Sequence, residues 1–164
     1  MAITNHERVG KALDLLKTGL APFVEREFKN LYAVRALAEA RRFQGEDRLL
    51  ATKKLAAWDA TALLKLMWEA WNDVFRRTLG HAERSLVSEL RDARNKWAHQ
   101  EPFSSDDADR ALDSAERLLT AVSASQADEV RKVKMELHRT IFDEQARSER
   151  RRSAGTAHVR TAAD

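Results

Sequence analysis

This chain has few residues that break helices, and that is the sequence feature that most strongly limits its possible folds. The 164 residues include five glycines and two prolines, while 34% are Asp, Glu, Lys or Arg. Glycine weakens the interior of a helix and proline breaks it, so this composition favours long, charge-decorated helices over a sheet. The sequence therefore predicts an all-α protein, an antiparallel helical bundle of four to six helices.

Length and composition are those of one folded domain. The chain is long enough for a single hydrophobic core, and 43% of its residues are hydrophobic. The absence of cysteine excludes disulfides, thiolate metal sites and cysteine nucleophiles. No apolar run of about 18 residues and no secretion signal are present, so we expect a cytoplasmic protein without membrane contact. The formal charge of +3 is compatible with nucleic acid but does not identify a ligand.

Apolar residues recur at helical spacing in the first half of the chain. A first helix begins after Asn5, a competent cap, and continues as one bent helix through Pro22. The pattern weakens before residue 59, where residues 44–47 form a turn. A central core helix covers residues 60–79, and Gly80 is placed where a left-handed helix cap is needed.

The second half predicts three more helices. One opens at His81 and ends near Glu101, because Pro102 disfavours helical geometry in the residue before it. Ser104 or Ser105 caps the next helix.

The last helix carries apolar residues at helical spacing over residues 130–141. The remaining residues lack this periodicity, and the cluster Arg150–Arg152 is most simply a solvated linker. We predict a helical domain over residues 1–143 and a basic, disordered tail over residues 144–164.

One helical segment combines an arginine, a polar amide and a histidine. A helix turns by about 100° per residue, so Asn95 and His99 stack one turn apart, and we expect Arg94 beside them on the same flank. The predicted core side of this helix is a different face, so we expect His99 to point away from the core. That core side consists of Leu86, Leu90, Ala93 and Trp97.

The six residues from Arg94 to His99 resemble the signature of the HEPN superfamily of small helical-bundle domains. In that signature an arginine, usually followed by a polar residue, precedes a histidine after a short spacer. The core helix before the motif and the helix break at Pro102 agree with this likeness, which covers most of residues 4–142. Asn95, residues 97–99 and residues 101–104 look like a bacterial branch often attached to ATPase or helicase-like modules in defence systems. No Gly-rich phosphate loop is present, so the resemblance implies a stand-alone domain or the amino-terminal part of a longer protein.

The resemblance implies a homodimer whose motif helices face one another and form a metal-independent endoribonuclease, toxin-like or defence-associated. RNA supplies its own 2′-hydroxyl nucleophile, so we expect no metal and no cofactor. The expected catalytic residues are His99 as general base or acid, Arg94 as stabiliser of phosphate charge, and Asn95, which orients His99 or holds a phosphate by hydrogen bonding. Arg91 and Lys96 are the expected RNA-binding residues. Besides RNA, an ATPase or an antitoxin is an expected partner.

Two other functions stay open at this point. The first is a non-catalytic helical dimerisation or RNA-binding adaptor for an ATPase partner. The second is a nucleotide-binding or nucleotide-modification partner protein. Without the resemblance, a solvent-facing histidine is more often a surface residue than a catalyst. Tryptophans at helical spacing are likewise more often core than platforms for stacked bases.

Overall fold

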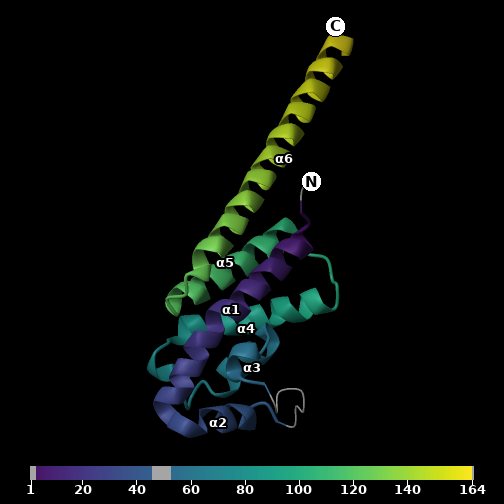
Figure 1. Cartoon of the computed structure of the whole chain (residues 1–164). Coiled ribbons are helices and arrows are strands. Elements are labelled where there is room, and N and C mark those ends of the chain that lie inside the picture. The colour runs from purple at the N-terminus through teal and green to yellow at the C-terminus, as the bar shows by residue number, and fades with distance from the viewer. Residues whose placement is uncertain (1–2, 46–52, 164) are drawn as a thin grey trace.

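The computed structural model describes residues 3–45 and 53–163, with side chains as far as residue 156. All regular secondary structure in these ranges is helical, so the all-α bundle is confirmed (Figure 1). The α-helices are α1 (Asn5–Tyr32), α2 (Ala36–Arg42), α3 (Ala60–Glu69), α4 (His81–Ala98), α5 (Ser105–Ala121) and α6 (Gln126–Ala163). Three short 3-10 segments accompany them: η1 (Ala33–Arg35), η2 (Leu55–Ala57) and η3 (Phe75–Arg77).

The first helix, α1, is the centre of the bundle. It packs against α2, α3, α4, α5 and α6, and α5 in turn packs between α4 and α6. Leu16, Leu20 and Phe28 of α1 are completely buried, because their spacing of four and eight residues places them on one face. A single hydrophobic core therefore joins helices from both ends of the chain.

The start of α1 differs from the prediction. Thr4, not Asn5, is the N-cap, since the Thr4 hydroxyl accepts the Glu7 N–H at 3.1 Å. The Asn5 amide instead donates to the carbonyl of Phe103 at 3.1 Å, which ties the first turn of α1 to the loop before α5. The helix continues through Pro22 as a single element, as expected.

The central core helix was predicted too long. Its N-cap is Asp59, whose carboxylate accepts the Ala62 N–H at 2.9 Å, but α3 ends at Glu69 instead of residue 79. Residues 70–78 form turns and η3, yet Trp71 and Phe75 remain buried there. The buried rings explain the misleading pattern, because apolar residues that pack from consecutive turns produce nearly the same spacing as a helix.

Gly80 and Gly45 both lie at turns, but they differ in backbone conformation. Gly80 has φ −105°, so it is not a left-handed cap; it is the N-cap of α4 and donates its N–H to Glu83 at 3.1 Å. Gly45, in contrast, has φ 72°, the left-handed region that glycine adopts readily. It belongs to the turn predicted at residues 44–47, of which residues 46 and 47 lie outside the described residues.

The last helix, α6, extends well beyond the bundle (Figure 1). Residues 144–163 are helical, whereas the sequence predicted a disordered tail from residue 144. Arg, Glu, Gln and Ala are favourable in helices, and extending a helix that is already packed requires no new nucleation. The division of the chain near residue 143 stays a prediction. In the described part of the chain, none of the helices has the length and apolar character needed to span a bilayer.

Candidate functional site

His99 lies at the C-terminal end of α4, where it is the C-cap and its side chain is exposed. The helix was predicted to continue to Glu101. It ends earlier because Gln100 has φ 55° and its N–H donates to the carbonyl of Trp97 at 3.1 Å. The Glu101 N–H donates to the carbonyl of Lys96 at 3.1 Å, which completes a Schellman motif. This reversal of the chain holds the imidazole at the exposed end of α4.

Trp97 fastens this end of α4 to the first turn of α1. Its indole N–H donates to the carbonyl of His6 at 3.0 Å, and the His6 ring lies stacked on the indole with 5.1 Å between centroids. The His6 ring nitrogen Nε2 is 3.1 Å from the Trp97 carbonyl. Gly10 provides the space for the indole, since a Cβ at that position would be 2.9 Å from its nitrogen. Sequence reasoning missed His6, which is 91 positions from Trp97 and carries no local signal.

The three expected catalytic residues do not share one side of α4. Asn95 and His99 are both exposed and lie about 40° apart around the helix axis. Arg94 is half-buried and about 140° from His99, so the expectation of a common flank is wrong for a single chain. The physical reason is that one residue of helix turns Arg94 by about 100° from Asn95 toward the core side.

The side chain of Lys96 already forms an ion pair with an acidic residue. Its ammonium group is 2.9 Å from the carboxylate of Asp107 and lies 5.1 Å from the centre of the Phe103 ring. The hydrogen bonds from Lys96 and Ser104 hold the pKa of Asp107 below its usual value. The RNA-binding role expected for Lys96 stays a prediction, and RNA would have to compete with Asp107 for the ammonium group.

A groove of about 360 Å³ runs between α4 and α5 on this side of α4. Its lining mixes acidic, basic and apolar side chains, and of the expected site residues it includes Lys96. His99 and Arg94 do not line it. The residues that line the groove are Glu89, Asp92, Ala93, Lys96, Phe103, Asp107, Arg110, Ala111 and Ser114.

Arg91, the other residue expected to bind RNA, lies on the α3 side of α4. Its guanidinium carbon is 6.0 Å from the centre of the Trp68 ring. Arg84, two turns earlier in α4, is 4.3 Å from the same ring. Sequence reasoning did not single out Arg84, although its spacing of seven residues from Arg91 places both on one face of a helix.

The Swt1-like HEPN family model matches residues 11–123. That range is more than half of the chain and includes all of α4 with the motif from Arg94 to His99. The chain belongs to the HEPN family. No curated protein and no solved structure matches the chain. The HEPN resemblance that the motif predicted is therefore confirmed, and it indicates an RNase or another nucleotide-related function.

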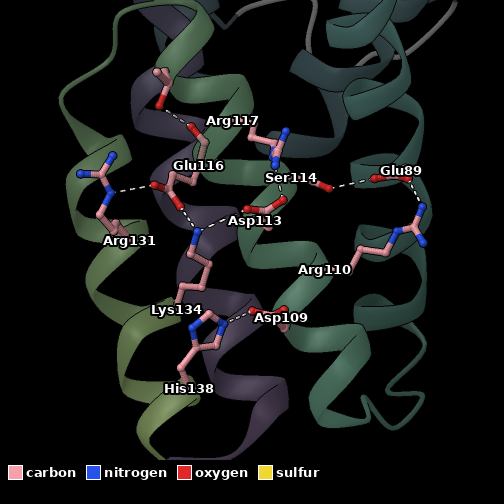
Figure 2. A network of polar contacts seen from close by, with 11 residues as sticks. Glu89, Asp109, Arg110, Asp113, Ser114, Glu116, Arg117, Arg131, Lys134 and His138 are labelled. Carbon is pink, nitrogen blue, oxygen red and sulfur yellow. Dashed lines mark hydrogen bonds and ion pairs between the residues drawn. The ribbon is translucent and has the colours of Figure 1, made fainter.

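A charged network attaches α6, which lies outside the matched range, to the HEPN bundle (Figure 2). Glu116 of α5 accepts from Arg131 at 2.7 Å and from Lys134, and Lys134 also lies 3.3 Å from Asp113. Burial alone would raise the pKa of Glu116, but the hydrogen bonds and charges of Lys134 and Arg131 outweigh it and hold that pKa below its usual value. Burial also acts on Lys134, yet its carboxylate partners hold its pKa above the usual value.

A second set of contacts attaches α5 to α4 (Figure 2). Glu89 of α4 accepts from Ser114 at 2.8 Å and from Arg110 of α5. The hydrogen bonds from Arg110 and Ser114 hold the pKa of Glu89 below its usual value. Near the start of α5, Asp109 pairs with His138 of α6. The Glu89–Arg110 pair therefore fixes α4, which carries His99, against α5, and the Asp109–His138 pair fixes α5 against α6.

Proposed function

We propose that this HEPN domain is a metal-independent endoribonuclease that acts as a homodimer through α4. The observation that supports the proposal best is the exposed position of His99, with Asn95 beside it, at an end of α4 that is fixed by Trp97. An exposed histidine on a rigid support can exchange protons with a substrate, while an arginine stays charged and binds phosphate oxygens.

In the proposed reaction, His99 accepts the proton of an RNA 2′-hydroxyl while the 2′-oxygen attacks the neighbouring phosphorus. The bond from phosphorus to the 5′-oxygen breaks, and that oxygen takes a proton from a water molecule. Arg94 stabilises the negative charge that develops on the phosphate, and Asn95 orients the imidazole or the phosphate. The products are a 2′,3′-cyclic phosphate and a free 5′-hydroxyl.

The separation of Arg94 from His99 favours a site shared by two copies. Because the two side chains leave α4 about 140° apart, one copy does not direct both at the same phosphate. A twofold contact through the exposed face of α4 would bring the same surface of a second copy opposite each histidine. We also propose a toxin-like or defence-associated role, with an antitoxin or ATPase partner, because Asn95, residues 97–99 and residues 101–104 resemble the bacterial branch.

The test is cleavage of varied RNA by the purified protein in EDTA. His99→Ala should reduce the rate by about 10²-fold or more, as expected on loss of a general acid or base. His81→Ala is the matched control, because His81 is an exposed histidine at the opposite end of the same helix. Mixing the Arg94→Gln and His99→Ala proteins should restore part of the activity if the site is composite. RNA left intact by the unchanged protein, or equal loss in both histidine variants, would contradict the proposal.

One observation favours the non-catalytic adaptor as a second candidate. Asp92 is exposed on the same face as His99, and its charge opposes the approach of a phosphate. An adaptor would form dimers, bind a partner ATPase or RNA, and show no His99-dependent cleavage. Size-exclusion chromatography of His99→Ala would then reveal an unchanged assembly. A nucleotide-binding role instead predicts a rise in melting temperature with added nucleotide.

A further inference from the structure

Two arginines of α4 lie over one tryptophan of α3. The Arg84 guanidinium carbon is 4.3 Å from the centre of the Trp68 ring and 6.0 Å from that of Trp71. The Arg91 guanidinium carbon is 6.0 Å from the Trp68 ring centre. Both arginines and Trp68 are half-buried, whereas Trp71 is buried in the core. We call Arg84, Arg91 and Trp68 the arginine shelf.

The guanidinium groups of the shelf have no acidic partner in the described part of the chain. Neither guanidinium group makes an ion pair or a hydrogen bond among those residues, and the buried Nε of Arg84 lacks an acceptor. Other basic side chains of the bundle do have carboxylate partners, for example Lys96 and Arg110. Arginines that stack on an aromatic face keep their charge and their outer N–H donors, and the stacking restricts their rotamers. The shelf therefore presents two positive charges that no ion pair in the described fold neutralises.

The shelf lies along the same stripe of α4 as the proposed catalytic histidine. Arg84, Arg91 and His99 fall within a sector of about 80° around the helix axis, and Asn95 lies inside it. From Arg84 to His99 the helix rises by about 22 Å at 1.5 Å per residue. A phosphate backbone that follows this stripe would meet both guanidinium groups before it reaches the imidazole.

We propose that the arginine shelf binds the phosphate backbone of the RNA strand that enters the His99 site. This inference rests on the proposed function and identifies how the substrate is held. Planar guanidinium groups match the geometry of phosphate oxygens, and such contacts position a strand without reading its sequence. The shelf therefore contributes affinity and register, while His99 and Arg94 carry out the chemistry.

The experiment measures binding of a fluorescently labelled single-stranded RNA by anisotropy in the His99→Ala background, where cleavage is removed. Replacing both Arg84 and Arg91 by glutamine should weaken binding roughly tenfold at low salt. It should also reduce the slope of log affinity against log salt by about 1.4, at about 0.7 for each lost phosphate contact with a single strand. The charge-matched control replaces Arg76 and Arg77 by glutamine, because both are exposed residues of η3 outside the shelf.

A second pair of substitutions is a control for loss of folding. Arg84→Lys with Arg91→Lys keeps both charges but not the planar stacking, so binding should weaken while the salt slope changes little. Circular dichroism of each protein verifies the fold. If the unchanged protein cleaves RNA but the glutamine variants of shelf and control bind alike, the shelf is wrong and the nuclease stands. If only the shelf variants lose affinity and His99 does not affect cleavage, the shelf stands and the nuclease fails.

Discussion

Replacing Gly10 with alanine should change the stability of this domain in opposite directions, depending on whether residue 97 is tryptophan. A Cβ at Gly10 would lie 2.9 Å from the Trp97 indole nitrogen and 3.2 Å from two carbons of the same ring. The ring cannot simply swing away, because its N–H is bonded to the His6 carbonyl at 3.0 Å and its face is stacked on the His6 ring. The added methyl group must therefore displace a side chain that is held on two sides.

The expected magnitude follows from two opposing effects. Forcing an extra methyl group into such a contact costs about 1–3 kcal/mol. Alanine gains about 1 kcal/mol over glycine inside a helix, and Gly10 is the sixth residue of α1. The net result is a loss of up to about 2 kcal/mol in the free energy of unfolding. In a Trp97→Phe background the clashing indole atoms are absent, so Gly10→Ala should instead stabilise the domain by about 1 kcal/mol.

Urea unfolding followed by far-UV circular dichroism on the four proteins of this cycle tests the prediction. Protein concentration must be constant, because dimerisation would contribute to apparent stability. The coupling between the two positions should be about 1–3 kcal/mol with unchanged m values. If Gly10→Ala stabilises both backgrounds equally, the indole does not press on α1 and our account of how the end of α4 is fixed is refuted.

Two further predictions concern the charged network and the helix end. Glu116→Gln should reduce the free energy of unfolding by about 2 kcal/mol at neutral pH, because it leaves a nearly buried Lys134 with one weaker partner. The pKa of Glu116 is lowered in the folded state, so its stabilisation is complete above the usual value of 4.5 and disappears as pH falls through the folded pKa. Urea unfolding of the unchanged protein and of the Glu116→Gln variant over a pH series should therefore show that the difference between their free energies of unfolding decreases at acid pH. An increase in that difference at acid pH would contradict the prediction. Gln100→Gly should raise stability by up to about 1 kcal/mol in thermal melts, because Gln100 has φ 55°, whereas the same change at Glu101 should not.

The helical class and several helix ends were predictable because their signals are local. Asp59 and Ser104 are both N-caps, as the hydrogen bonds from their side chains to the first turns of α3 and α5 require. The HEPN motif is also local, since the residues from Arg94 to His99 occupy one short stretch of helix. Composition, periodicity and short motifs were therefore sufficient for the fold class and the family.

Other features of the site depend on contacts between distant segments, which periodicity does not encode. The position of His99 is decided by Trp97, whose partner His6 is 91 positions away, and by the left-handed turn at Gln100. That the Arg84 guanidinium has no acidic partner among the described residues is apparent only when α3 and α4 are packed together. Spacing along one chain determined which residues share a helix face. Tertiary packing alone decided which of them are exposed, paired or free, because burial and pairing depend on the neighbouring helix.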